Sequence, residues 1–108
     1  MTTIRALIRL PATARPGEVI EVRLLLQHPM ETGFRPGADG RTVPRNIVRR
    51  VEAMFEGERV FAADLFPAIA ANPYLAFPLR ATKSGTLAIS IEGDNGLLQR
   101  ETAVLTVG

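Results

Sequence analysis

Few residues of this chain can do chemistry, and the most distinctive of them follow directly on a predicted strand. The only histidine, His28, opens the segment HPMETG, where it could act as a general base or join Met30 and Glu31 as a metal ligand. Nucleophilic catalysis, however, needs an activated Ser, Cys, Thr or Lys beside the base, and metal sites gather several ligands at set spacings. The chain has no cysteine, and its two serines lie in a predicted turn and a predicted strand. We therefore predict that the chain is not an enzyme and that it holds neither a metal nor a cofactor.

The structural interpretation of these residues is a strand end that leads into a loop. Pro29 stops the backbone pairing of a strand, and Gly33 can supply a positive φ. The segment NPY at 72–74 has a similar interpretation, in which the asparagine fixes a turn and the tyrosine buries its ring while its hydroxyl reaches water or a carbonyl. These residues alone favour the structural role. A working base at His28 would instead show a perturbed pKa and activity that is lost on substitution.

The elements around these residues have the pattern of short strands. Apolar and polar residues alternate from Ile4 to Leu10 and, more regularly, from Glu18 to His28. Asp94-Asn95-Gly96 is a strong hairpin signal, and a glycine at 57 separates two short apolar runs as a hairpin turn would. The segment 46–55 has helical spacing, yet its surroundings favour a strand. The proline-containing crossover that follows could hold one helical turn at 68–71.

About seven short strands, each bounded by turn residues, predict an all-β fold, an immunoglobulin-like antiparallel β-sandwich. The length suits a single domain over residues 1–108. The longest irregular segment runs from Pro29 to Arg45 and contains three prolines and three glycines. Because an ordered loop of this length is often functional, we predict that it binds something.

The composition argues against two classes of function. Of 108 residues, 46% are hydrophobic and 22% are charged, and the formal net charge is only +2. The twelve arginines alternate with apolar residues or sit beside acids, so we expect no nucleic-acid binding. These faces are most simply solvated, although arginine and tyrosine also anchor protein interfaces. No segment approaches the roughly 20 apolar residues of a membrane helix, and Arg5 and Arg9 interrupt any N-terminal secretory signal.

Three segments carry a family resemblance: HPMETGFRPGADGRTVPRNIV, FEGERVFAADLFPAIAANPYLAF and SGTLAISIEGDNG. Together they resemble the SoxZ family, a subunit of the SoxYZ sulfur carrier of bacterial thiosulfate oxidation. The resemblance implies a non-catalytic sandwich that pairs with SoxY, whose C-terminal cysteine arm carries sulfur intermediates while other Sox enzymes process them. It also implies a periplasmic location, because SoxZ-like chains lack a signal and are exported together with a signal-bearing SoxY.

The long loop and the resemblance meet in one hypothesis about partner binding. We expect the loop and the NPY turn to form one surface that docks SoxY or a visiting enzyme, with two arginines donating to carboxylates or to an anionic sulfur adduct. The residues of this surface are His28, Met30, Glu31, Thr32, Gly33, Arg35, Pro44, Arg45, Asn72, Pro73 and Tyr74. The alternative function is a generic adhesion or structural sandwich, which predicts no selective partner. Without SoxY, exposed strand edges could also drive self-pairing into a homo-oligomer.

Overall fold

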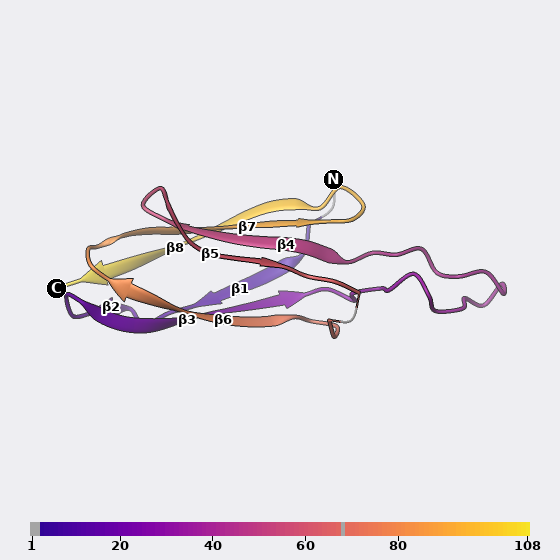
Figure 1. Cartoon of the computed structure of the whole chain (residues 1–108), viewed down its shortest axis with the longest axis horizontal. Helices are drawn as coiled ribbons and strands as arrows, with labels where there is room; N and C mark the ends of the chain where they lie inside the picture. Colours follow the sequence, from indigo (N-terminus) through magenta and orange to yellow (C-terminus); the bar gives the residue numbers. More distant parts are fainter. Residues whose placement is uncertain (1–2, 68) are drawn as a thin grey trace.

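The computed structural model describes residues 3–67 and 69–108, which form eight strands in two stacked sheets (Figure 1). The strands are β1 (Arg5–Arg9), β2 (Thr13–Ala14), β3 (Glu18–Gln27), β4 (Val48–Phe55), β5 (Glu58–Asp64), β6 (Tyr74–Ala81), β7 (Gly85–Gly93) and β8 (Leu98–Val107). One sheet has the order β1-β3-β6, and the other has the order β2-β8-β7-β4-β5. Apart from the short parallel β2–β8 pair, the pairings are antiparallel. The predicted sandwich is therefore confirmed, with one short strand more than expected.

The local sequence signals correspond to the observed turns and strands. Asn95 and Gly96 have φ values of 60° and 77°, and Glu56 and Gly57 have values of 48° and 83°. Two consecutive residues of positive φ are typical of the type I′ turn that joins antiparallel strands, so both predicted hairpins are confirmed. The ambiguous segment 46–55 is a strand for most of its length, because β4 pairs with β5 on one side and with β7 on the other. The helical turn considered at 68–71 includes Ala68, which lies outside the described residues.

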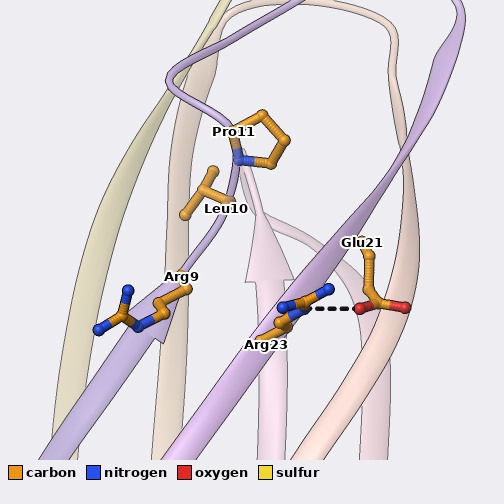
Figure 2. A pocket seen from close by; sticks show the side chains of 5 residues that line it. All are labelled: Arg9, Leu10, Pro11, Glu21 and Arg23. Carbon is orange, nitrogen blue, oxygen red and sulfur yellow. Dashed lines mark hydrogen bonds and ion pairs between the residues drawn. The ribbon is translucent and has the colours of Figure 1, made fainter.

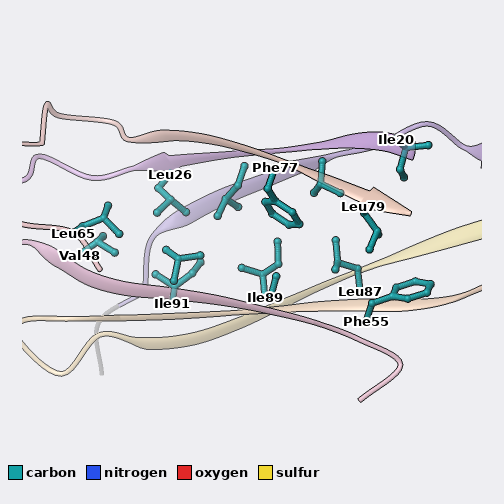
Figure 3. Packing of buried hydrophobic residues seen from close by; sticks show 14 of the residues in the cluster. Ile20, Leu26, Val48, Phe55, Leu65, Phe77, Leu79, Leu87, Ile89 and Ile91 are labelled. Atoms are coloured by element: carbon teal, nitrogen blue, oxygen red, sulfur yellow. The ribbon is translucent and has the colours of Figure 1, made fainter. Parts of the chain in front are cut away.

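The core lies between the two sheets and takes its side chains from the inward faces of both (Figure 3). In β3 every second residue from Ile20 to Leu26 is buried, as the alternation predicts. Phe77 of β6 stacks on Phe61 of β5, with ring centroids 4.4 Å apart and planes inclined by 5°, and so joins the two sheets. The described residues contain no helix of the length and hydropathy that crossing a membrane requires.

A side chain also links the two sheets near the start of the chain. The Gln99 side chain lies on β8, where its Nε2 donates to the Ile4 carbonyl at 2.8 Å and its Oε1 accepts from the Ile4 N–H at 2.9 Å. These two bonds replace the pairing that a neighbouring strand would give the Ile4 backbone.

The connection from β3 to β4 spans residues 28–47, and its residues 29–46 form an extended arm that projects beyond the sheets along the long axis of the molecule (Figure 1). The arm folds back on itself through isolated bridges between Glu31 and Asn46 and between Pro36 and Thr42. Its tip is a turn in which the Gly37 N–H donates to the Arg41 carbonyl at 2.6 Å. The arm accounts for part of the 58 Å length of the molecule, whose other two dimensions are 23 and 18 Å.

Candidate functional site

The base of the arm is organised around His28, which is only 3% exposed. Its Nδ1 accepts a hydrogen bond from the Met30 N–H at 2.9 Å. Its backbone N–H donates to Asn72 Oδ1 at 3.0 Å, and the Asn72 N–H donates back to the His28 carbonyl at 2.8 Å. The end of β3 is therefore tied to the turn that precedes β6, and Asn72 holds that turn with a φ of 54°.

The surroundings of the His28 imidazole favour its neutral form. Burial lowers its pKa below the ordinary value, and an interaction with the Asn46 side chain and the charge of Asp94 oppose this effect without cancelling it. The Asn46 Oδ1 is buried and has no hydrogen-bond partner of good geometry among the described residues. A lowered pKa is compatible with a general base, but a histidine this deeply buried cannot reach a substrate, so the geometry favours the structural role.

Met30 anchors the start of the arm to β4. Its side chain is buried, its φ is 51°, and its Sδ accepts a hydrogen bond from the Val48 N–H at 3.3 Å. Glu31 and Asn46 then exchange two backbone hydrogen bonds of 2.8 Å each. The first residues of the arm are thus fixed to the sandwich by buried contacts.

The middle of the arm exposes its side chains. Phe34 is 81% exposed, which is unusual for an aromatic residue, and its N–H donates to Thr32 Oγ1 at 3.2 Å. Arg35 Nη2 lies 2.6 Å from Glu31 Oε1, and this hydrogen bond is the main cause of the lowered pKa of Glu31. The guanidinium of Arg35 is exposed but already has one carboxylate partner.

The Arg45 side chain is partly exposed, and its guanidinium binds the β7–β8 hairpin. Its Nε and Nη2 bind the two carboxylate oxygens of Asp94 at 2.9 and 3.0 Å. Asp94 also accepts the Ile47 N–H at 3.1 Å, and Arg49 lies 3.3 Å away. Burial acts to raise the pKa of Asp94, but these hydrogen bonds and the two guanidinium charges outweigh it and lower the pKa. Sequence reasoning placed Asp94 only in a turn, because its pairing with a residue 49 positions away has no local signal.

The structure divides the predicted surface residues among three places. His28, Met30 and Pro73 are buried, so their side chains cannot contact a partner in this conformation. The predicted residues that lie at the base of the arm or along it are Glu31, Thr32, Gly33, Arg35, Pro44, Arg45 and Asn72. Tyr74 lies apart from them, on the outer face of the β1-β3-β6 sheet, where it is 57% exposed. Whether the exposed members bind a partner stays a prediction.

The outer face of the β1-β3-β6 sheet holds, beside Tyr74, two leucines that the sequence interpretation did not single out. Leu7, Leu25 and Tyr74 lie directly opposite one another across the three strands and form one apolar row. Arg9 and Arg23 form the next row, and all five residues line one shallow hollow. The signal was present in the alternation, since leucines occupy outward positions of β1 and β3.

A second hollow of about 290 Å³ adjoins the first and is lined by Arg9, Leu10, Pro11, Glu21 and Arg23 (Figure 2). Arg23 Nε donates to Glu21 Oε1 at 2.7 Å. This bond, followed by the proximity of Tyr74, raises the pKa of Arg23. The face is therefore a hollowed surface with apolar and basic character. Among the described residues, no three His, Cys, Asp or Glu side chains form a group that could hold a metal ion.

Comparison with known proteins gives a family and a fold. The family model described as Sulphur oxidation protein SoxZ matches residues 8–104. No curated protein sequence matches the chain. A superoxide reductase (neelaredoxin) from Ignicoccus hospitalis has a similar structure, with a TM-score of 0.76, 22% identity, and coverage of 98% of this chain and 82% of that one.

Two further solved structures have the same sandwich. The sulfur carrier protein SoxY from Chlorobium limicola f thiosulfatophilum has a TM-score of 0.68 and 16% identity, with 95% of this chain and 79% of that chain covered. A putative superoxide reductase from Thermotoga maritima has a TM-score of 0.74 and 14% identity, with 95% and 85% covered. At such identities these likenesses show a shared fold and carry no function across.

Proposed function

The chain belongs to the SoxZ family of sulphur oxidation proteins, and we propose that it is the non-catalytic partner subunit of a SoxYZ sulfur carrier. In this role it supports a SoxY-type subunit, whose C-terminal cysteine arm carries covalent sulfur intermediates during bacterial thiosulfate oxidation. Other Sox enzymes visit the complex transiently and process the sulfur that the arm carries.

The observation that carries the proposal is the absence of cysteine from a member of a sulfur oxidation family. A covalent sulfur carrier needs a thiolate as its attachment point, and these 108 residues offer none. The cysteine must therefore come from a partner. The chain then has a supporting role, because it contributes a folded surface and the partner contributes the reactive cysteine.

The environment of His28 supports the non-catalytic part of the proposal. Its Nδ1 already accepts the Met30 N–H, and the ring is buried beneath the base of the arm. A general base must reach the proton that it removes, directly or through one water. The only histidine of the chain instead holds a loop in place.

We place the complex in the periplasm, where the chain arrives by export together with a signal-bearing SoxY. Membership of the SoxZ family supports this placement, since the resemblance implies export together with SoxY. Export in the folded, paired state would need no signal on this subunit. Fractionation of cells that express the chain with and without its partner tests this placement, and periplasmic chain in the absence of the partner would contradict it.

The test of the proposed function is co-expression with the SoxY-type protein of the same source. The tagged chain is purified, and the copurified partner is examined by mass spectrometry for sulfur adducts on its cysteine. We expect a one-to-one complex whose adducts sit on the partner. A chain that captures no SoxY-type protein would contradict the proposal and would favour a generic adhesion or structural sandwich.

A further inference from the structure

The outer face of the β1-β3-β6 sheet has the composition of a docking surface. Leu7, Leu25 and Tyr74 form its central row, with exposed fractions between 36% and 57%. The solvated face of an antiparallel sheet is normally polar, so three apolar neighbours in one row need an explanation. A tyrosine beside leucines in a shallow hollow is the kind of anchor that protein interfaces use.

The residues around this row are basic. Arg5 flanks the row on one side, and Arg9 and Arg23 flank it on the other. Glu21 neutralises Arg23 through their hydrogen bond, whereas within residues 3–67 and 69–108 Arg5 and Arg9 form no ion pair. An occupant of this face therefore meets an apolar centre between unpaired guanidinium groups. Carboxylates opposite these groups would complement them and would steer the encounter.

The charge of the face argues against a second copy of this chain as the occupant. A two-fold pairing whose axis runs along the apolar row would set Arg5 of one copy against Arg9 and Arg23 of the other, and an axis along the strands would bring the two copies of Arg23 together. Juxtaposed like charges oppose association, and a single acid, Glu21, already engaged by Arg23, cannot offset them. A partner with acidic residues around an apolar patch has no such conflict.

We propose that the outer face of the β1-β3-β6 sheet, centred on Leu7, Leu25 and Tyr74, docks a partner protein whose surface presents an apolar patch flanked by carboxylates. This inference rests on the proposed function, in that the partner is then the cysteine-bearing SoxY-type subunit. It moves the docking surface away from the arm, to which most of the sequence hypothesis assigned it, and keeps only Tyr74 from that hypothesis.

The experiment compares the binding of matched variants of this chain to the purified SoxY-type protein. Tyr74→Ala removes the aromatic anchor, and Arg9→Glu reverses an exposed charge. Phe34→Ala is the matched variant on the arm, where the aromatic side chain is even more exposed. Val104→Ala is the control on β8, because this valine is exposed on the other sheet. Affinity for the SoxY-type protein is measured by calorimetry, and thermal unfolding confirms that each variant is folded.

We expect Tyr74→Ala and Arg9→Glu each to weaken binding by about tenfold or more, and Phe34→Ala and Val104→Ala to change it less than about threefold. The wild-type affinity should fall as salt rises from 50 to 500 mM, and Arg9→Glu should flatten this dependence. If Tyr74→Ala fails to fold, the affinity of Arg9→Glu and the salt dependence of binding still test the proposed docking surface.

Three outcomes would overturn the inference. If Phe34→Ala weakens binding while both face variants bind normally, the partner docks on the arm, and the proposed function survives without this surface. If the isolated chain sediments as a dimer that Tyr74→Ala dissociates, the face belongs to a second copy. If the wild-type chain binds no SoxY-type protein at all, the proposed function fails, and this inference fails with it.

Discussion

Arg45 and Asp94 form a two-point ion pair that fastens the returning end of the arm to the turn between β7 and β8. Asp94 receives the Ile47 N–H as well, and its own N–H donates to the Ile47 carbonyl at 2.9 Å. One carboxylate thus links a side chain of the arm to the backbone at the start of β4. This connection explains how a long irregular segment keeps a defined direction.

Replacing Asp94 by alanine should destabilise the fold. The change leaves the Ile47 N–H without its side-chain acceptor and releases both Arg45 and Arg49. We expect a loss of about 1–3 kcal/mol in the free energy of unfolding, measured by urea denaturation at pH 7. Glu92→Ala is the matched control, since its 3.6 Å contact with Arg49 is exposed, and it should cost less than about 0.5 kcal/mol. Equal losses in the two variants would contradict this account.

The Asp94 contribution should disappear in acid. The fold lowers the pKa of this carboxyl below its ordinary value of 3.8, so the charged form is favoured in the folded state. The stabilisation is therefore fully present above pH 3.8 and is lost as the pH falls through the lower, folded-state pKa. We expect the difference in unfolding free energy between wild type and Asp94→Asn to shrink below pH 4. A difference that stayed constant down to pH 2 would show that the carboxylate charge is not responsible.

His28 should make stability depend on pH in a higher range. Because burial lowers its pKa below 6.5, the unfolded chain binds a proton that the folded chain excludes. The free energy of unfolding should therefore fall as the pH is lowered from 7 to 5. His28→Asn keeps an acceptor for the Met30 N–H but cannot titrate, so this part of the pH dependence should be missing from the variant. Parallel stability profiles for the two proteins would refute the assignment.

Gly33 should be required for the shape of the arm. Its φ is 88°, and a Cβ placed on it would lie 3.0 Å from Arg45 Cβ, which is too close without a shift. Gly40 has a similar φ of 80° but open space around it, so Gly40→Ala carries the conformational cost alone. We expect trypsin to cleave the arm after Arg41 several times faster in Gly33→Ala than in Gly40→Ala. Equal cleavage rates would mean that the contact with Arg45 is unimportant.

The stacked pair between the sheets should be among the costliest contacts to lose. Phe77 is 3% exposed and packs on Phe61 at 4.4 Å. Phe77→Ala should lower the free energy of unfolding by about 3–5 kcal/mol, measured by urea denaturation, because it removes transfer energy and leaves a cavity. Phe61→Ala should cost less, since Phe61 is only half-buried. The reverse order would contradict this account of the core.

Elements with strong local signals were predictable from the sequence. The alternation of β3 predicted its start, its end to within one residue and its buried face, and Asn95-Gly96 predicted the β7–β8 hairpin. Strand β4 was ambiguous because its apolar residues also suit a helix, and only pairing with β5 and β7 decides between the two. Beyond the two predicted hairpins, local pattern carries no information on which strands become neighbours, so the remaining strand order of the sheets had no sequence signal.

The candidate site was predictable only in part, for the same reason. The sequence pointed to the arm and to the turn at Asn72, and the structure joins them through His28. It could not show that His28 and Met30 point inward, because burial depends on the partner strands. The apolar row was not predictable as a row, since Leu7, Leu25 and Tyr74 become neighbours only through the β1–β3 and β3–β6 pairings.

This row has a consequence for how the chain is made. Its three residues come from the first, third and sixth strands, so a nascent chain that has not yet released β6 from the ribosome cannot display it. An unfolded or truncated chain presents the same residues scattered along a flexible polymer. A protein that recognises the complete row would therefore bind finished, folded molecules and ignore incomplete ones. Pairing would then act as a quality check that needs no chaperone of its own.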